Sequence, residues 1–431
     1  MNNSKSLLST IMMVLVIVLM VVGGFLYLGS YFWGFFFIMA AAIVFFVRLG
    51  LLNGIDSVKQ TGFGFLKQLS VPFFGIFFAI FLAAVIMLFT GYNPLVALKA
   101  LFYGGFIKNW HVAVLNATPL IFTGLSIAIA FKAGLFNIGA EGQYYIGVMA
   151  STWLGLRLGL PGFIVIPLIF ILAGACAAAY NVIPSLLKVK TGASEVITTM
   201  MFAHIARYLS PIFIRANGGD PSTSTHAYVT DPIAESAWLP PFKNFLPEAN
   251  YRLHTGIIIA ILMAFVVSYF LYKTKYGFEI RAVGQNKDAA RAQGISVGKN
   301  IMRAMLFAGL LAGMAGVTET LGLTHKMFDN LNAGYGWNGI SVALLASNNP
   351  IAIIFTSLLW GALDAGGQYM TRTTQVPNSI VEIIKGIILF LIVAKYIYSF
   401  IGNRFKRGKK SASGGSSAED GAVSGSGAKA V

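Results

Sequence analysis

The chain has 431 residues, of which 57% are hydrophobic and 11% are charged, and its mean hydropathy is +0.75. This composition excludes a water-soluble domain with a polar surface and predicts an all-α polytopic membrane protein. The formal net charge of +16 fits basic loops on one side of a membrane, because no basic stripe interleaved with aromatic residues indicates nucleic-acid binding.

Apolar runs long enough to cross a membrane, which takes about 20 residues, recur along the chain. Spans are predicted at about 7–28, 32–52, 69–90, 112–131, 140–158, 162–186, 194–214, 254–272, 301–323, 350–369 and 379–401. The first two form a predicted N-terminal transmembrane hairpin within residues 1–55, and residues 69–401 form the main transmembrane domain. Residues 411–431 are rich in Ser and Gly and are predicted to be a disordered tail.

A shorter apolar segment at about 338–347 is predicted to be a half-helix, because it is too short to span and a polar Ser-Asn-Asn-Pro sequence follows it. It contains Gly-Ile-Ser-Val-Ala at 339–343, which echoes Gly-Leu-Ser-Ile-Ala at 124–128. Repeated halves with polar breaks at matching positions are a common way to build a transport path. The echo therefore favours two pseudo-repeated halves, although a chance likeness of apolar helices explains it as well.

Basic residues gather in alternate connections between the spans, which are expected to be cytoplasmic. They are Lys59, Lys67, Lys132, Lys188, Lys190, Lys273, Lys275, Arg281, Lys287, Arg291 and Lys299. A basic cluster near residues 404–410 agrees, so both termini are predicted to be cytoplasmic if the half-helix completes one crossing with an extended stretch. The Pro-rich loop Gly218–Arg252 is expected on the opposite side.

A polar, glycine-rich octet, Phe-Asn-Ile-Gly-Ala-Glu-Gly-Gln at 136–143, interrupts the apolar runs. An ionised carboxylate at the centre of a membrane helix costs roughly 2.5–3.5 kcal/mol, so Glu141 is expected to face the bundle interior or a watery path. The alternative is a short loop at the membrane surface.

The connection from Lys273 to Asn300 is the largest polar insertion on the predicted cytoplasmic side. Helix formers from Asn286 to Gln293, closed by Gly294, predict a short surface helix with little side-chain bulk, suited to docking in a partner's groove. A merely solvated loop is the alternative.

Three segments then resemble a known family. Asp288-Ala289-Ala290, followed after three residues by Gly294, resembles the loop through which permeases of ATP-binding-cassette (ABC) importers contact their ATPases. The segment 118–143, with the octet at its end, and the segment 339–350 resemble permeases for branched-chain amino acids, ribose and nucleosides, and the nucleoside branch in particular. The match covers about 69–401.

The resemblance implies a ten-helix permease core, with the N-terminal hairpin outside it. Relatives carry an Asn soon after the Met pair at 200–201, where this chain has Ala203 and His204. This departure leaves the specificity open, and His204 alone is predicted to be a packed or hydrogen-bonded core histidine rather than a ligand contact.

By the same resemblance, the polar lining of a substrate path is expected from Asn137, Glu141, Gln143, Ser126, Glu319 and Asn338. Contacts with the ATPase are expected from Arg281, Asp288, Ala289, Ala290 and Gly294. The implied function is a permease subunit in a bacterial cell membrane that moves nucleosides into the cytoplasm. Its implied partners are an ABC ATPase, a second permease subunit and an extracytoplasmic substrate-binding (lipo)protein.

No phosphate-binding Gly-x-x-x-x-Gly-Lys-Ser/Thr sequence, metal-ligand spacing or nucleophile motif occurs. The chain is therefore predicted not to be an enzyme and to need no metal or cofactor. Glu382 and Lys385 stand one helical turn apart and are expected to neutralise each other. The single cysteine, Cys176, is expected to be a small packing residue.

Alternatives remain open at this point. A secondary transporter driven by an ion gradient would use Glu141 or Glu319 as its carrier carboxylate. Within the importer class, ribose or another sugar and branched-chain amino acids are alternative substrates. A membrane-embedded enzyme acting on lipid has no clustered catalytic residues to support it.

Overall fold

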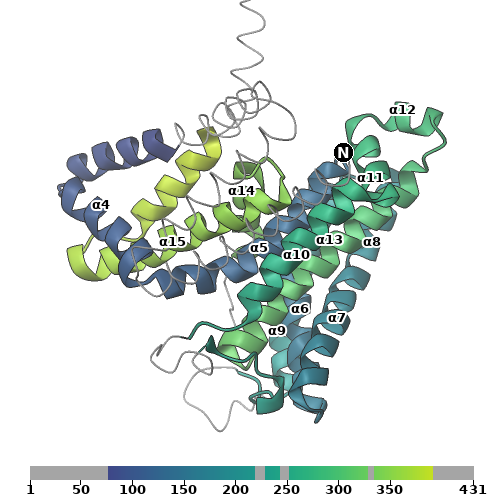
Figure 1. Ribbon diagram of the computed structural model, residues 1–431, viewed down its shortest axis with the longest axis horizontal. Coiled ribbons are helices and arrows are strands. Elements are labelled where there is room, and N and C mark those ends of the chain that lie inside the picture. The colour runs from purple at the N-terminus through teal and green to yellow at the C-terminus, as the bar shows by residue number, and fades with distance from the viewer. Residues whose placement is uncertain (1–75, 219–228, 243–251, 329–333, 392–431) are drawn as a thin grey trace, which may run out of the picture. The chain divides into compact units, whose positions relative to one another are not determined.

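The computed structural model describes residues 76–218, 229–242, 252–328 and 334–391 (Figure 1). The chain divides into two compact units, Met1–Phe77 and Phe78–Val431, and the labelled helices belong to the second. The predicted hairpin within 1–55 and the predicted tail at 411–431 lie outside the described residues.

The described part of the chain is almost entirely helical. A short apolar helix, Ile76–Phe89, comes first. It is followed by α4 (Pro94–Phe102), the π-helix η1 (Tyr103–Lys108), α5 (Trp110–Lys132), α6 (Ala140–Arg157), α7 (Gly162–Tyr180), α8 (Val182–Thr191), α9 (Glu195–Ala216), the 3-10 helix η2 (Glu235–Ala237), α10 (Gly256–Lys273), α11 (Lys275–Gln285), α12 (Lys287–Ala292), α13 (Val297–Glu319), the π-helix η4 (Thr320–Thr324), α14 (Tyr335–Leu345) and α15 (Pro350–Thr374). A last helix covers 379–391.

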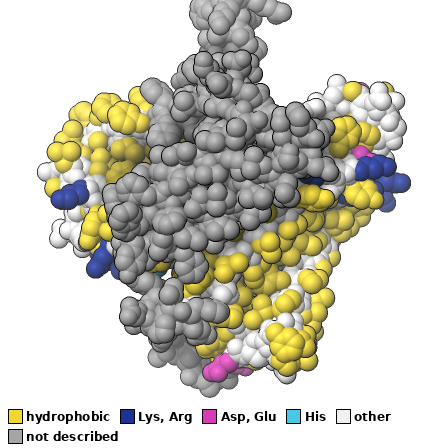
Figure 2. All heavy atoms as spheres, viewed as in Figure 1, with side chains coloured by type: hydrophobic (Ala, Val, Ile, Leu, Met, Phe, Trp, Pro, Cys, Tyr) yellow, Lys and Arg dark blue, Asp and Glu magenta, His cyan; other side chains and the backbone are white. Residues whose placement is uncertain are grey.

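Six helices among the described residues are long and apolar enough to cross a membrane. They are Trp110–Lys132, Gly162–Thr191, Glu195–Ala216, Gly256–Lys273, Val297–Thr324 and Pro350–Thr374. In Figure 2, hydrophobic side chains cover much of the coloured surface, and Lys and Arg lie near α11 on one side and near α4 on the other. These findings confirm the predicted all-α polytopic membrane class.

Two helices, α5 and α13, form the centre of this unit and are the most buried of the six. Helix α5 packs against α10, α13, α14 and α15, and α13 packs against α5, α6 and α7. Small residues line these contacts: Ala140, Ala312 and Ala343 meet Ile127 where α5, α6, α13 and α14 converge. Close approach through small residues is how helices pack in a membrane, where apolar surface alone gives little drive to associate.

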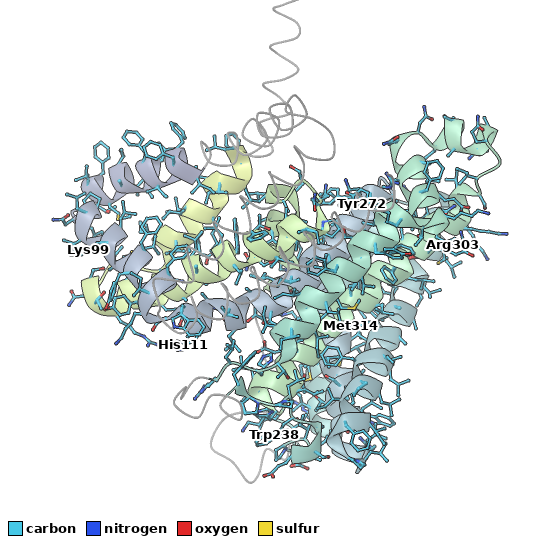
Figure 3. The ribbon with its side chains drawn as sticks, viewed as in Figure 1. Lys99, His111, Trp238, Tyr272, Arg303 and Met314 are labelled. Carbon is cyan, nitrogen blue, oxygen red and sulfur yellow. The ribbon has the colours of Figure 1, made fainter. Side chains whose placement is uncertain are left out.

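Residues at the two ends of α13 mark two separate regions. Its first residues follow α12, whereas η4 at its other end pairs with the segment 229–242 through the Leu239 amide and the Leu321 carbonyl, at 2.8 Å. Figure 3 shows this separation, with Tyr272 and Arg303 toward the α11–α12 end, Trp238 at the other end and Met314 between them.

The span predicted at 162–186 is present as Gly162–Thr191, in which α7 and α8 meet at Asn181, whose Nδ2 donates to the Met305 carbonyl at 2.6 Å. Two other expectations need correction. Cys176 is exposed on α7, so its predicted packing role is wrong. Helix α4 was not predicted, although Asn93 caps it and Pro94 begins it.

The close contact between α6 and α13 makes a specific prediction. A Cβ added at Gly147 would collide with the backbone of Gly313, whereas one added at Gly386 on the last helix would meet no atom within 4 Å. We expect Gly147→Ala to destabilise the protein by about 1–3 kcal/mol, because overpacking forces the backbones apart. Gly386→Ala is the matched control. Thermal unfolding in detergent measures both, and equal stability of the two variants would contradict the packing described.

Candidate functional site

The polar octet forms the turn that leads from α5 into α6. Asn137 accepts from the Gly139 amide through Oδ1 at 3.1 Å. Its side chain also exchanges two hydrogen bonds with Gln143, each 3.2 Å long. Both side chains are 2% exposed, so the two amides satisfy each other and hold the start of α6 in place.

Glu141 joins this turn to a distant part of the chain. Its Oε2 accepts from the Gly336 amide at 2.6 Å, in the first turn of the short helix α14. The first amides of a helix have no partner within it and carry the positive end of the helix dipole, so a carboxylate is stabilised there. A side chain at Gly336 would collide with the backbone of Glu141, so glycine is what allows the approach.

Helix α14 begins inside the bundle rather than at its surface. The Tyr335 carbonyl accepts from Thr123 Oγ1 at 3.0 Å, and Thr123 lies near the middle of α5. The Tyr335 ring also meets the Tyr144 ring edge-on, with centroids 5.8 Å apart. The half-helix predicted at 338–347 is therefore confirmed as α14, and it ends in a turn where Ser347 and Asn348 have positive φ angles of 50° and 56°. Such interrupted helices are tolerated at membrane depth only where protein or a cavity shields them.

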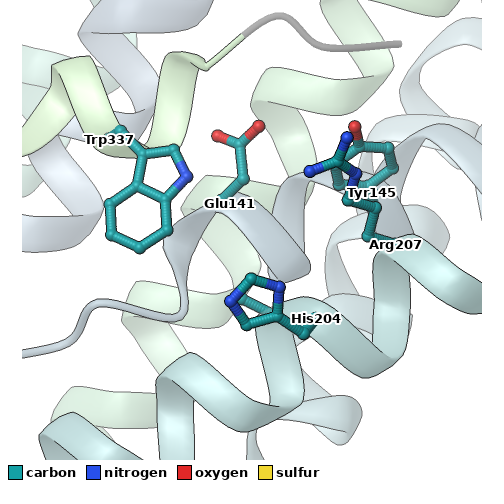
Figure 4. Close-up of a pocket in the computed structure, with 6 residues that line it drawn as sticks. Glu141, Tyr145, His204, Arg207 and Trp337 are labelled. Atoms are coloured by element: carbon teal, nitrogen blue, oxygen red, sulfur yellow. The ribbon is translucent and has the colours of Figure 1, made fainter. Parts of the chain in front are cut away.

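A cavity opens beside the Glu141 carboxylate, between α6, α9 and the start of α14 (Figure 4). It is lined by Glu141, Tyr145, Ala203, His204, Arg207 and Trp337. Its volume of about 30 Å³ is far below the roughly 300–1,000 Å³ of ligand sites, so in this conformation it holds water and no larger molecule.

His204 lies at the cavity wall and is exposed. The prediction of a packed core histidine is therefore wrong. Helix α9 is apolar around most of its circumference, so the sequence does not show which side faces a cavity. Ala203, beside it, packs against Gly142 of α6 and brings the two helices close together.

The other residues predicted for a substrate path lie apart from this cavity. Ser126 is fully buried on α5, and its hydroxyl has no hydrogen-bond partner among the described residues. Glu319 ends α13 and is 8% exposed. Asn338 accepts from Trp360 Nε1 through Oδ1 at 3.2 Å. Of the six residues predicted for the substrate path, only Glu141 lines the cavity. The other side chains that line the cavity were not predicted for that path.

The predicted surface helix in the Lys273–Asn300 connection is present as α12. Asn286 caps it by accepting from the Asp288 and Ala289 amides, each at 3.0 Å. At its other end Gly294, with φ +77°, allows the Ile295 amide to bond the Ala290 carbonyl at 3.0 Å. Ala290 is buried under the helix, while Ala289 is exposed.

A groove of about 860 Å³ runs between α11, α12 and the start of α13, and we call it the α12 groove. Ala289 and Gly294 lie on one side of it and Phe278 on another. Lys275, Lys299 and Arg303 also line it, and its one carboxylate, Glu279, is paired with Arg303 at 3.1 Å. The groove therefore combines apolar side chains with basic ones.

Arg281, predicted to contact an ATPase, is anchored within the chain. Its Nε donates to the Leu271 carbonyl at 3.0 Å, and its guanidinium lies 5.1 Å from the centroid of the Tyr272 ring. These contacts fix α11 against the end of α10. Arg281 therefore helps to position α11, which forms one wall of the groove.

A second cluster of charges joins α15 to the last helix. Lys385, which is 5% exposed, contacts Asp364 at 2.6 Å and Glu382 at 2.9 Å. The expected pairing of Glu382 with Lys385 is present, but the shorter contact is with Asp364, which the sequence did not single out. A buried cation that holds two carboxylates ties the last helix in place.

The segment 229–242 covers the end of the bundle at η4. Trp238 stacks on His325 with ring centroids 4.0 Å apart, and the Ile233 amide donates to the His325 carbonyl at 2.9 Å. His254 accepts from the Gly256 amide through Nδ1 at 3.1 Å. Burial, together with nearby His325, lowers the pKa of His254 to about 4, so this ring is neutral near pH 7 and can accept that bond.

The fold and these sites define a polytopic membrane permease, with an interrupted helix at its centre and a groove at one end. Residues 112–393 match the model of a family described as the permease component of a branched-chain amino acid transport system. The chain belongs to this family.

Curated relatives cover most of the chain. It is 36% identical over 346 residues to the guanosine ABC transporter permease protein NupP of Bacillus subtilis, covering 79% of this chain and 98% of the relative. It is 34% identical to the nucleoside ABC transporter permease protein NupB of Lactococcus lactis, over 77% and 92% of the two chains. It is also 32% identical to the glucose ABC transporter permease protein TsgB13 of Haloferax volcanii, over 68% and 79%. No solved structure matches.

The cluster around Lys385 makes a prediction about stability. Lys385→Met leaves Asp364, the less exposed of its two carboxylate partners, without its cation, and we expect it to destabilise the protein by about 3–5 kcal/mol. Adding Asp364→Asn should recover much of that loss, because the buried anion is removed as well. Thermal unfolding of the single and double variants measures the coupling. A double variant less stable than Lys385→Met alone would contradict the pairing described.

Proposed function

We propose that this chain is the membrane-spanning subunit of an ABC importer that carries nucleosides into the cytoplasm. The observation that carries the proposal is the similarity to two permeases named for guanosine and nucleosides, each covered almost from end to end. The chain would supply the path, and ATP binding and hydrolysis in a separate subunit would drive the change between outward-open and inward-open states. Bound nucleoside and ATP each favour one state only through different affinities for the two.

The α12 groove supports the ATPase as a partner. Its lining combines apolar Phe278 and Ala289 with basic Lys275 and Lys299. An amphipathic helix with an acidic side fits such a groove. Helix α12 projects at this end beside α11, so movement of a bound partner would pass into α10 through Arg281 and into α13 directly (Figure 1).

A second permease subunit is supported by α9. His204 and Arg207 lie near the middle of this membrane-spanning helix, and both are exposed on the single chain. A cationic side chain at that depth faces protein or a watery cavity rather than lipid. A second permease packed along α9 would cover this face and complete the wall of the cavity. An extracytoplasmic binding protein would then deliver substrate at the η4 end, with both termini in the cytoplasm of a bacterial cell.

Two alternatives have a specific basis. Because one relative is named for glucose, a sugar is the second candidate substrate. An ion-coupled transporter with Glu141 as carrier is less well supported, because one oxygen of that carboxylate is held by the Gly336 amide in the first turn of α14.

Purification of the chain from its native membrane in mild detergent, with mass spectrometry of the proteins that accompany it, tests the class. A nucleotide-binding ATPase and a second permease are expected. A chain that comes out alone in several detergents would contradict the importer. Uptake of tritiated guanosine, with glucose and ribose as competitors, tests the substrate.

The groove makes a sharper prediction. Ala289→Trp places an indole in the α12 groove, so we expect ATPase co-purification and nucleoside uptake each to fall at least about 10-fold, the change that about 1.4 kcal/mol of lost contact produces. Ala292→Trp is the control, because Ala292 is exposed on the same helix but does not line the groove. Equal uptake in the two variants would remove the groove as the docking site.

A further inference from the structure

Trp337 is a large aromatic side chain left 42% exposed at the first turn of α14. Its neighbours fix its depth, because Gly336 is bound to Glu141 and Tyr335 to Thr123, near the middle of α5. It therefore does not lie in the belt at the membrane surface where tryptophans commonly anchor a protein. The indole instead borders the cavity beside Glu141 (Figure 4).

The cavity combines ring systems with charge. Trp337, His204 and Tyr145 supply rings, while Glu141 and Arg207 supply an anion and a cation. Figure 4 shows the carboxylate between the indole and the guanidinium, with the imidazole of His204 below them. A nucleobase has a π face that stacks on an indole and polar edges that bond to charged groups, whereas a sugar alone has hydroxyl groups and no π face.

We infer that Trp337 is the platform on which the nucleobase of the substrate stacks as it passes α14. The Glu141 carboxylate and the guanidinium of Arg207, which line the same cavity, bind the polar edges of the same molecule. This inference rests on the proposed nucleoside function and assigns base recognition to this one site. The cavity is too small for a nucleoside in the conformation described, so stacking takes place when α9 and α14 separate.

The test compares an aromatic with an aliphatic replacement of the same residue. KM and maximal rate for tritiated guanosine are measured in cells that express the whole transporter with Trp337→Phe or Trp337→Leu. Base–aromatic stacking in proteins is worth enough that we expect KM to rise about 5- to 150-fold in Trp337→Leu. Trp337→Phe, which keeps a π face, should stay within about 3-fold of the unaltered protein. Co-purification of the partner subunits confirms that each variant assembles.

A control is available at Trp153, which is 45% exposed at the end of α6 and lies under the Arg157 guanidinium, away from the cavity. Trp153→Leu should leave KM unchanged. Equal KM values for the Phe and Leu variants at position 337 would overturn the stacking role, and so would a Leu variant with the KM of the unaltered protein. An unaltered transporter that takes up no nucleoside would instead overturn the proposed function itself, and the two failures are thereby distinguished.

Discussion

The hydrogen bond between the Glu141 carboxylate and the Gly336 amide is the contact on which the centre of this protein depends. It joins residues 195 positions apart and satisfies two groups that are costly to bury in a membrane, a carboxylate and the open end of a helix. Removing the carboxylate would leave the Gly336 amide without this partner at that depth. The same contact sets the position of α14, and with it the position of Trp337 at the cavity.

Small residues make that contact possible. Gly336 lies directly against the backbone of Glu141, and Gly142, the residue after Glu141, packs against Ala203 of α9. The Asn137–Gln143 pair locks the turn from which Glu141 projects. The polar octet therefore fixes one carboxylate, that of Glu141, between two helices. Of the octet's residues, only Glu141 lines the cavity.

The arrangement suits a transporter because one helix, α13, runs from one end of the bundle past its middle to the other end. Helix α13 begins beside the α12 groove, passes α6 at Gly313 and Gly147, and ends at η4 under the segment 229–242. One continuous, close-packed helix therefore joins the groove, α6 and the opposite end of the bundle. The small cavity volume indicates a conformation closed around the site.

Much of the fold was predictable because its signals are local. The membrane spans follow from apolar length, α12 from a capping Asn286 and a closing Gly294, and α14 from a short apolar run before a polar turn. Helix α4 is not evident from apolar length, although Asn93 and Pro94 mark its start, because its 9 residues are too few to cross a membrane.

The site was less predictable because it depends on contacts between distant segments. Glu141 stood out as a carboxylate in an apolar chain, but nothing near it in sequence indicates Gly336 as its partner. Trp337 and His204 lie on helices that are apolar on several sides, so periodicity does not show that they face a cavity. Asp364 does not stand out in the sequence, because its partner Lys385 lies on the next helix.

The central claim is that Glu141 holds the first turn of α14 in place. The most direct measurement is amide hydrogen exchange of the segment 334–345 in the purified transporter, comparing the unaltered protein with Glu141→Ala. Glu382→Ala, at a carboxylate that is 59% exposed on the last helix, serves as the control. The account predicts faster exchange in the first turn of α14 for Glu141→Ala alone, with α13 unchanged. Equal protection of that turn in all three proteins would show that α14 keeps its position without Glu141 and would contradict the account.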